Sequence, residues 1–439
     1  MQIENIINGQ IREGARRTGF QVWSLPETTA HDVEFALKVA NAQSYDKAVP
    51  LPETTALLAS IGRDQDWIEE SHLVEIAQKS GSPIKYLHTT VQRFNRWLAH
   101  LDEYVTSLGH VNSAGQLVRG GLNWQGGLTS SLILAGDEAT LAPWALTHAL
   151  LAGSPGIAKP SSIEPLSAFL FLKAVIKRGG RTPALLAFDS TQEHDRAQIG
   201  RIIRHTNQSV VFGEDHTIAS IYQPLPFLPA HKAIPYWSGR SGVIVYPDAD
   251  VVQSARAIIA GATEDRGNRC ISTKKVFAPR SMASTLEQHL VAEADKLVRG
   301  DPLDAHTDLG VNEPGARRRA EQVAAGADVF YTRDFLMARC DDHADLLCNE
   351  VPYPAVALRY YDDGEDPVAL ANLSVRNAPS GRALVISVFT ESDKGFAQAA
   401  SRLYARKVLR NLPTGYWDPV KTHQAIHLCL ELMRPCEAM

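Results

Sequence analysis

One cysteine lies in a loop whose residue types suit a nucleophile. Residues 267–272 read GNRCIS, so the thiol of Cys270 has small and polar neighbours. A helix is expected upstream over 250–262, capped by an acidic residue at its start, and a strand is expected downstream over 275–278. A thiol in a glycine-opened loop, with a helix and a strand holding its two ends, is where a nucleophile would be placed. The competing interpretation is a buried, inert cysteine, which is the usual fate of this residue type.

The composition is that of an ordinary globular protein. The 439-residue chain is 44% hydrophobic and 21% charged, and at that length two or three packed units are expected. The formal net charge of −5 argues against nucleic acid or an anionic membrane surface as the main partner.

The cysteines and the start of the chain favour a cytoplasmic protein. The five cysteines show no CxxC spacing and the 15 histidines form no HExxH motif, so no metal site is expected. No apolar run approaches the roughly 18 residues that span a bilayer. The first residues, MQIEN, lack the basic and apolar regions of a signal peptide.

Apolar runs and amphipathic helices alternate from Leu128 onward. The runs predict strands at 132–135, 156–158, 184–188, 210–212 and 243–245. The clearest helix between them has Pro165 in its first turn and Gly179 just past its end. This alternation predicts a parallel sheet covered on both faces, which binds ligands at the carboxyl ends of its strands. Lys159 and Gly213 stand at two such ends.

Three further segments surround this region. Thr29 and Asp32 form a candidate capping box for a helix that ends near Ala42. After Pro83, apolar residues at spacings of three and four predict one continuous helical stripe over 84–105. Turn signals between short β-prone pieces predict a hairpin at 108–127.

Six motifs, in order along nearly the whole chain, resemble those of the aldehyde dehydrogenase superfamily. They are K-P-S at 159–161, F-T-G without its Thr at 211–213, the strand and D-A-D at 241–250, the nucleophile loop at 267–270, G-D-P-L at 300–303, and E-x-F-G-P at 350–354 with Pro352 and Tyr353 in place of Phe and Gly. Each motif is short, but six in the right order at similar spacings are specific.

The resemblance implies an α/β fold with three parts. A Rossmann-type parallel-sheet cofactor domain would comprise 1–107 and 128–235, and an α/β catalytic domain would comprise 236–409. A small β oligomerisation element would be formed by the hairpin at 108–127 and the tail at 410–439. Such elements join subunits, so a homodimer or homotetramer is expected.

The family's motifs, carried onto this chain, imply roles for individual residues. Cys270 would be the nucleophile, and Lys159 would hydrogen-bond the adenosine ribose of a nicotinamide cofactor. Gly213 would let the chain pass close to the cofactor, and Glu350 would hold the nicotinamide ribose. Ser162 stands where NAD-preferring members often carry a glutamate, and a serine leaves room for a 2′-phosphate, which favours NADPH over NADH. The alternatives are a solvated lysine at 159 and a surface ion pair at 350.

Two positions depart from the hydrolytic members of the family. Tyr236, 34 residues before Cys270, replaces the glutamate that activates water. Asp137, 22 residues before Lys159, replaces the asparagine that steadies the oxyanion. An ionised Asp137 would repel an oxyanion, whereas a protonated one could donate to it but needs a strongly raised pKa. Asp137 therefore weakens the site, faces away from it, or is kept neutral.

The functional hypothesis follows from the absence of a glutamate at position 236. Tyrosine, with a reference pKa of about 10, is a poor base, so a thioacyl-enzyme on Cys270 would persist. In this respect the chain is closest to the acyl-CoA reductases. The leading hypothesis is therefore NAD(P)H-dependent reduction of an acyl thioester, carried on CoA or an acyl carrier protein, to an aldehyde.

Three other functions remain open. They are NAD(P)-dependent oxidation of an aldehyde to a carboxylic acid, reduction of an acyl phosphate, and a non-catalytic role, for which Asp137 is the best support. Arg269, beside the nucleophile, would pair with an anionic substrate group or with a carboxylate across the loop such as Asp265.

Overall fold

The chain divides into two compact units. Unit 1 comprises residues 1–80, 87–237 and 418–439, and unit 2 comprises 81–86 and 238–417. The main division falls two residues after the expected one, and residues 410–417, expected in the tail, cluster with unit 2. The computed structural model describes residues 2–12, 16–17, 23–43, 50–136, 138–189, 193–226, 229–416 and 427–437.

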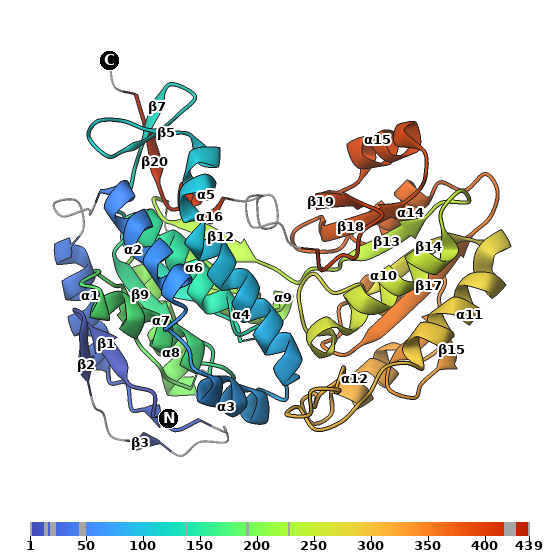
Figure 1. The fold of residues 1–439 in the computed structure, drawn as a ribbon, viewed down its shortest axis with the longest axis horizontal. Coiled ribbons are helices and arrows are strands. Elements are labelled where there is room, and N and C mark those ends of the chain that lie inside the picture. The colour runs from blue at the N-terminus through green and yellow to red at the C-terminus, as the bar shows by residue number, and fades with distance from the viewer. Residues whose placement is uncertain are drawn as a thin grey trace. The chain divides into compact units, whose positions relative to one another are not determined.

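Unit 1 is built on a mostly parallel sheet (Figure 1). In the described part of the chain its order is β12-β11-β8-β9-β10-β1-β2. These strands are β1 (Asn5–Ile7), β2 (Gln10–Arg12), β8 (Ser130–Ile133), β9 (Gly156–Lys159), β10 (Ala184–Leu185), β11 (Gln208–Phe212) and β12 (Lys232–Tyr236). β8 to β12 run parallel, and β1 and β2 add an antiparallel edge.

Four of the five predicted apolar runs overlap strands of this sheet, and the run at 243–245 belongs to unit 2. The sequence pattern did not predict β12, because two of its five residues are exposed.

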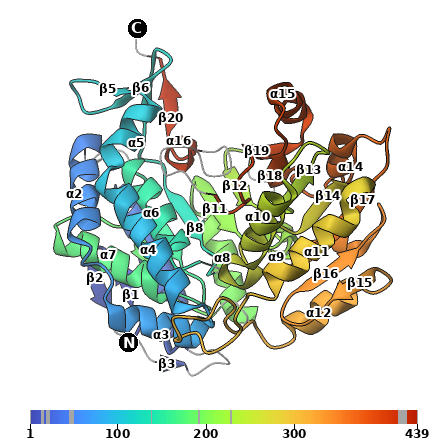
Figure 2. The ribbon, with the colours of Figure 1, turned by 45° about the vertical axis from the view of Figure 1, so that its right-hand side comes forward.

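Helices cover both faces of the unit 1 sheet (Figure 2). The helices of this part of the chain are α1 (Ala30–Gln43), α2 (Leu51–Asp64), α3 (Glu70–Ser80), α4 (Ile84–Ala99), α5 (Leu101–Leu108), α6 (Leu141–Leu151), α7 (Leu166–Lys177), α8 (Glu193–Arg204) and α9 (Asp215–Tyr222), with α16 (Leu428–Glu431) near the end of the chain. The apolar sides of α1, α8 and α9 share one hydrophobic cluster with the sheet. α2, α6 and α7 pack against one another.

Two sequence-based expectations for these helices had different outcomes. The capping box of α1 is confirmed, because the backbone N–H of Thr29 donates to Asp32 Oδ2 (2.9 Å) and that of Asp32 donates to Thr29 Oγ1 (3.2 Å). The continuous helix over 84–105 is wrong, because the chain breaks at His100 (φ −112°, ψ 33°). The apolar stripe continues across the break, with Leu98 and Leu101 both fully buried, so the spacing alone did not reveal it.

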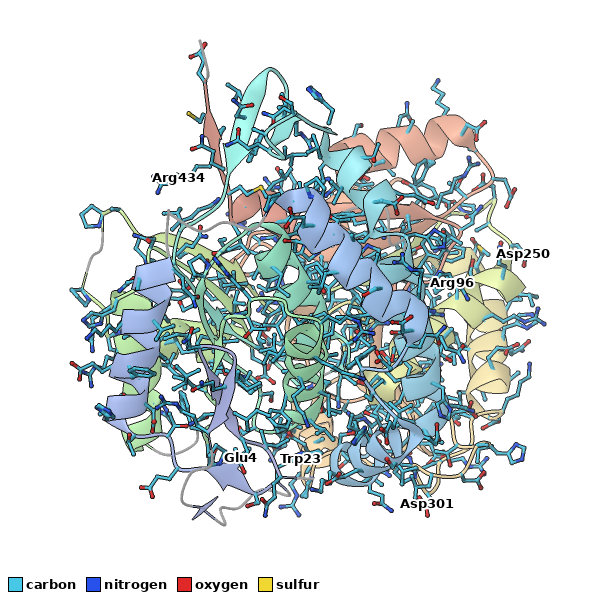
Figure 3. The ribbon with its side chains drawn as sticks, turned by 60° about the vertical axis from the view of Figure 1, so that its left-hand side comes forward. Glu4, Trp23, Arg96, Asp250, Asp301 and Arg434 are labelled. Atoms are coloured by element: carbon cyan, nitrogen blue, oxygen red, sulfur yellow. The ribbon has the colours of Figure 1, made fainter. Side chains whose placement is uncertain are left out.

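A small antiparallel sheet completes unit 1. It contains β5 (His110–Val111), β6 (Leu117–Arg119), β7 (Leu122–Gln125) and β20 (Arg434–Cys436), in the order β20-β7-β6-β5. Asn112 Oδ1 accepts the backbone N–H groups of Ala114 and Gln116 (both 3.0 Å), which closes the predicted turn. Arg434 marks the strand that the end of the chain adds (Figure 3). Elsewhere β3 (Arg16–Arg17) pairs with β4 (Leu25–Pro26).

Unit 2 repeats the layered α/β plan. Its sheet, in the described residues, has the order β15-β16-β17-β14-β13-β18-β19, and only β15 is antiparallel to its neighbour. The strands are β13 (Gly242–Val245), β14 (Lys275–Pro279), β15 (Asp328–Tyr331), β16 (Leu336–Arg339), β17 (Ala355–Tyr361), β18 (Ala383–Phe389) and β19 (Ala405–Arg410). The predicted strand after Cys270 is therefore present as β14.

The two faces of this sheet carry separate hydrophobic clusters. One includes α10 (Val251–Thr263) and α11 (Ala283–Ala294), and the other includes α12 (Ala316–Val323), α13 (Asp345–Cys348), α14 (Pro367–Leu373) and α15 (Asp393–Arg402). Two short 3-10 turns follow helix and strand at Glu264–Gly267 and Arg280–Met282. The expected fold class is thus confirmed. Over the residues that the structure describes, no helix is long and apolar enough to cross a bilayer.

Asp250 caps the helix that leads to the nucleophile loop. Its carboxylate accepts the backbone N–H groups of Val252 (2.8 Å) and Gln253 (3.0 Å) at the start of α10. We expect Asp250→Ala to lower the free energy of unfolding by about 1 kcal/mol, and Asp250→Asn to retain most of it, because an amide oxygen also accepts these bonds. Urea denaturation measures both. An alanine variant as stable as wild type would contradict the capping role.

Candidate active site

Three motif segments meet at one edge of the unit 2 sheet. Cys270 precedes β14, the segment 239–241 precedes β13, and the segment 350–354 precedes β17. These strands are adjacent and parallel. The residues therefore gather at the amino ends of the strands, whereas sequence reasoning placed ligand sites of such sheets at the carboxyl ends.

The backbones of Gly239 and Cys270 are in close contact. A Cβ at Gly239 would lie 1.4 Å from the carbonyl oxygen of Cys270. The same oxygen accepts the hydroxyl of Ser241 (3.3 Å), and Gly239 O accepts the backbone N–H of Leu384 (2.7 Å). Cys270 itself is only partly buried, beside a small cluster that includes Ile271. Cys270 is therefore not a fully buried core residue, as the inert alternative would require.

The chain reaches Cys270 through a strained turn. Asp265 (φ 45°), Arg266 (φ 61°) and Gly267 (φ 70°) adopt left-handed conformations in succession, which costs about 1–3 kcal/mol for each non-glycine residue. Asp265 Oδ1 accepts the hydroxyl of Ser82 (2.7 Å) and Nε of Arg266 (3.2 Å), and Arg266 Nη1 donates to Val311 O (3.1 Å). These buried contacts stabilise the turn, which sets the direction in which the chain enters the loop that carries Cys270.

Arg269 is engaged within the loop. Its Nη1 donates to Glu264 Oε2 (2.6 Å), and the guanidinium is buried. Of the two alternatives expected for Arg269, this is the ion pair with a carboxylate across the loop. The partner is Glu264 rather than Asp265. Glu264 occupies one N–H of the guanidinium, and these contacts give the substrate-binding role of Arg269 no support.

Glu350 contacts the segment that precedes β13. Its Oε2 accepts the backbone N–H of Arg240 (2.9 Å). Burial raises the pKa of this carboxyl, while the ammonium of Lys274 and the N–H groups of Arg240 and Gly239 oppose the shift. The carboxylate of Glu350 accepts a backbone N–H, whereas the alternative expected for this residue was an ion pair at the surface.

Unit 1 carries a separate set of motif residues at the carboxyl ends of its strands. The strand order reverses between β8 and β11, which is where doubly wound sheets bind ligands. Gly213 follows β11, and Lys159 ends β9, with its side chain buried and Nζ 5.5 Å from the centre of the Phe188 ring. The solvated-lysine alternative does not apply to Lys159. Asp137, after β8, lies outside the described residues.

The donors at this edge of unit 1 fit a nicotinamide dinucleotide. Lys159 offers an ammonium, and Ser161 and Ser162 offer hydroxyls that suit ribose groups. The backbone is packed closely here, because a Cβ at Gly136 would lie 2.6 Å from the Ser161 side chain. Ser162 is buried.

Tyr236 is part of the interior of unit 1. It ends β12, it is 3% exposed, and its ring stacks on that of Phe212 with centroids 4.2 Å apart and planes inclined by 15°. The ring of Trp144 lies edge-on at 6.5 Å. Tyr236, which the resemblance places at the position of the family's glutamate, is therefore packed as an aromatic core residue.

Sequence reasoning missed three buried ionisable residues. Burial raises the pKa of Glu164 to about 7, although the N–H and hydroxyl of Ser167 oppose the shift. Burial lowers the pKa of Lys274 to about 8 and that of Lys275 to about 7. Two successive lysines beside the nucleophile loop were a visible signal, but the sequence does not show that both are buried.

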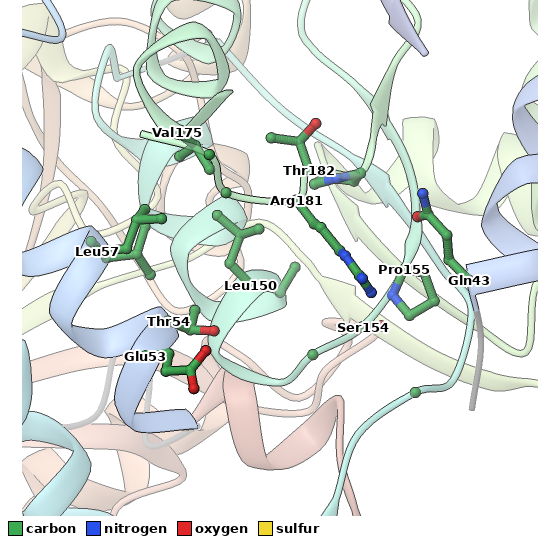
Figure 4. Close-up of a pocket in the computed structure, with 17 residues that line it drawn as sticks. Gln43, Glu53, Thr54, Leu57, Leu150, Ser154, Pro155, Val175, Arg181 and Thr182 are labelled. Atoms are coloured by element: carbon green, nitrogen blue, oxygen red, sulfur yellow. The ribbon is translucent and has the colours of Figure 1, made fainter. Parts of the chain in front are cut away.

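A cavity of about 300 Å³ lies elsewhere in unit 1 (Figure 4). Leu57, Leu150, Val175 and Arg181 are among the residues that line it. It opens beside the residues that precede β9 and β10. It is therefore at the opposite edge of the sheet from Lys159 and Gly213.

The contact between Gly239 and Cys270 predicts a steric effect. Gly239→Ala must push the two segments apart, and overpacking of this kind typically costs about 1–3 kcal/mol. We expect a lower melting temperature and a changed rate of Cys270 alkylation by iodoacetamide. Gly200→Ala is the control, because its Cβ would meet only Leu225 Cδ2, at an ordinary contact distance of 3.4 Å. Wild-type alkylation in Gly239→Ala would contradict the close packing.

Glu164 predicts a pH-dependent stability. Because burial raises its folded pKa to about 7 from 4.5, the folded state holds this proton more tightly than the unfolded state. Its contribution to stability is therefore present below pH 4.5 and is lost as the pH rises through 7. We expect Glu164→Gln to melt near the wild-type temperature at pH 4.5 and above it at pH 8. An equal difference at both pH values would count against the shift.

Comparisons with known proteins agree with these motifs. The profile described as the aldehyde dehydrogenase family matches residues 138–420. Betaine aldehyde dehydrogenase 2 of Rhizobium meliloti (strain 1021) is 26% identical over 249 residues, which are 53% of this chain and 51% of the relative. The 3-sulfolactaldehyde dehydrogenase of Priestia aryabhattai is 26% identical over 278 residues, 58% of this chain and 54% of the relative. The chain thus spans about half the length of the curated relatives it matches.

Solved structures share the fold along nearly the whole chain. An oxidoreductase from Marinobacter aquaeolei has a TM-score of 0.81 at 18% identity, covering 99% of this chain and 97% of its own. The NADP-dependent glyceraldehyde-3-phosphate dehydrogenase from Bacillus halodurans C-125, complexed with NADP, has a TM-score of 0.82 at 18% identity, covering 99% and 98%. Because the matching profile extends over more than half of the sequence, the chain belongs to the aldehyde dehydrogenase family.

Proposed function

We propose that this chain is an NAD(P)-dependent oxidoreductase whose preferred reaction is the reduction of an acyl thioester to an aldehyde through a thioacyl-enzyme on Cys270. The proposal that the substrate is an acyl thioester rests on the packing of Tyr236. Its ring is stacked on Phe212 at the position where hydrolytic members of the family hold a carboxylate. A phenol buried among aromatic rings has no means of activating water at neutral pH.

The residues of this chain have distinct parts in the proposed reaction. The Cys270 thiolate attacks the thioester carbonyl, the backbone N–H of Cys270 donates to the oxyanion, and the carrier thiol leaves with its electron pair. Lys159 and Ser162 would hold the adenosine ribose, and Glu350 would hold the nicotinamide ribose. When bound, the cofactor supplies the hydride.

Two features support a cofactor preference and a thiol-bearing partner. Ser162 is a small residue where a longer carboxylate would crowd a 2′-phosphate, which favours NADPH. A thioester substrate requires CoA or a carrier protein as the leaving thiol. A homodimer or homotetramer, joined through the small antiparallel sheet, remains the expected assembly.

The second candidate is oxidation of an aldehyde to its acid. The names of the relatives favour it, since they include dehydrogenases of betaine aldehyde and 3-sulfolactaldehyde. It requires a group other than Tyr236 to activate water. Reduction of an acyl phosphate would also proceed without that base. A non-catalytic role is disfavoured by the incomplete burial of Cys270 and by the buried Lys159.

Product analysis separates the two main candidates. Hexanoyl-CoA with NADPH is expected to yield hexanal and free CoA with wild type and none with Cys270→Ser. Hexanal with NADP is expected to yield acid at least tenfold more slowly than it yields hexanoyl-CoA when CoA is supplied. The same assays with NADH measure the cofactor preference. Rapid acid release without CoA would establish aldehyde oxidation instead, and Tyr236→Glu is avoided because its carboxylate would be buried beside Phe212.

A further inference from the structure

Lys274 links two of the segments that form the candidate site. It lies between Cys270 and β14, and its side chain is 3% exposed. Its ammonium donates to three backbone carbonyls, those of Gly267 (2.5 Å), Val351 (2.7 Å) and Tyr353 (3.0 Å). The first belongs to the nucleophile loop, and the other two belong to the segment that begins at Glu350. One buried cation therefore holds both segments by their backbones.

These bonds close a ring of contacts within unit 2. Gly239 touches the backbone of Cys270, and the next residue, Arg240, donates its N–H to Glu350. Lys274 then connects the chain after Glu350 back to Gly267. Gly267 is itself pressed against this segment, because a Cβ there would lie 2.7 Å from Pro354 Cα. The ring therefore ties the backbone of the nucleophile loop to the segments at 239–240 and 350–354.

We propose that Lys274 is a positioning residue, which sets the orientation of the Cys270 backbone N–H toward the reacting carbonyl by holding Gly267 to the segment 351–353. The proposal rests on the proposed function, in which Cys270 is the nucleophile. Lys274 touches no reacting atom. It acts through the carbonyl of Gly267, three residues before the thiol.

The protonation state of Lys274 determines how many of these bonds can form. An ammonium has three N–H donors, which match the three carbonyls, whereas a neutral amine has two donors and a lone pair. Burial lowers the pKa of Lys274 to about 8, and the nearby charge of Glu350 opposes that shift. One carbonyl therefore loses its donor as the pH rises through about 8, and the ring loosens.

The neighbouring lysine provides a matched control. Lys275 is equally buried, and burial lowers its pKa to about 7. Its Nζ donates to Ser374 Oγ (3.1 Å) at the end of α14 rather than to the nucleophile loop. Removal of either lysine eliminates a buried charge, but only Lys274 joins the loop to the segment after Glu350.

The test uses p-nitrophenyl acetate with the full chain and without cofactor. The Cys270 thiolate attacks the ester carbonyl, the carbon–oxygen bond to the nitrophenol breaks, and p-nitrophenolate leaves with the electron pair, which gives a thioester and a coloured burst. The burst rate is measured from pH 6 to 10. In wild type we expect it to rise as the thiol ionises and to fall again above pH 8 or so, in line with the pKa of Lys274.

The variants distinguish positioning from a purely structural role. Lys274→Met is expected to slow the burst about a hundredfold, near the loss caused by removing one oxyanion donor. Lys274→Arg, which stays charged, should lose the alkaline decline and react within tenfold of wild type. Lys275→Met should keep the decline. A burst in Lys274→Met within threefold of wild type, or an unchanged decline in Lys274→Arg, would overturn the proposal.

Two controls keep the outcome interpretable. If Lys274→Met fails to fold, as judged by circular dichroism, the comparison of wild type with Lys274→Arg still decides, because identical pH profiles would overturn the proposal. Cys270→Ala should show no burst. A burst that persists in Cys270→Ala would remove Cys270 as the nucleophile and overturn the proposed function itself, whereas the lysine variants test the positioning alone.

Discussion

The site in unit 2 depends on the contact between the backbone of Gly239 and the carbonyl of Cys270. No side chain larger than hydrogen fits at 239, because a Cβ would lie 1.4 Å from that oxygen. The strand that follows Gly239 and the strand that follows Cys270 are hydrogen-bonded neighbours, β13 and β14. The thiol therefore takes its place from the sheet itself, through two loops that enter adjacent strands. The helix capped by Asp250 and the strained turn at 265–267 lead the chain into the loop that holds Cys270.

Buried charge is the second organising feature of this site. Lys274 and Lys275 are buried in unit 2 and Glu350 is partly buried beside them, and burial shifts their pKa values toward the neutral forms. Burial of a charge is unfavourable unless hydrogen bonds compensate it. Here the compensation comes mainly from backbone groups: three carbonyls for Lys274 and the N–H of Arg240 for Glu350. Backbone partners bind loops to one another, which side-chain ion pairs on the surface do less effectively.

Unit 1 holds Tyr236, the residue on which the proposed chemistry depends most. A glutamate at 236 would need a polar, partly hydrated setting to accept a proton from water. The tyrosine found there is stacked on Phe212, and the ring of Trp144 lies nearly perpendicular to it. The proposed persistence of the thioacyl-enzyme rests on this packing, because the family's motifs alone do not distinguish reduction of the acyl group from its hydrolysis.

The sequence by itself determined the elements and the family. The cap at Asp250, the strand after Cys270, the capping box at Thr29 and the hairpin near 108–127 follow from local preferences, and six motifs in order identified the family. Local sequence patterns did not predict two features of the fold. The break at His100 interrupts no apolar periodicity, and β12 was missed because exposed residues mask its pattern.

Only the tertiary structure decided how the motif residues are used. It paired Arg269 with Glu264, buried Tyr236 between aromatic rings, and placed Lys274 within reach of carbonyls almost eighty residues away. Burial and long-range pairing depend on which strands become neighbours in a sheet, and no residue spacing records that order. The sequence therefore determined which groups the chain possesses, while the sheet determined which of them meet, because proximity across strands is a property of the folded backbone.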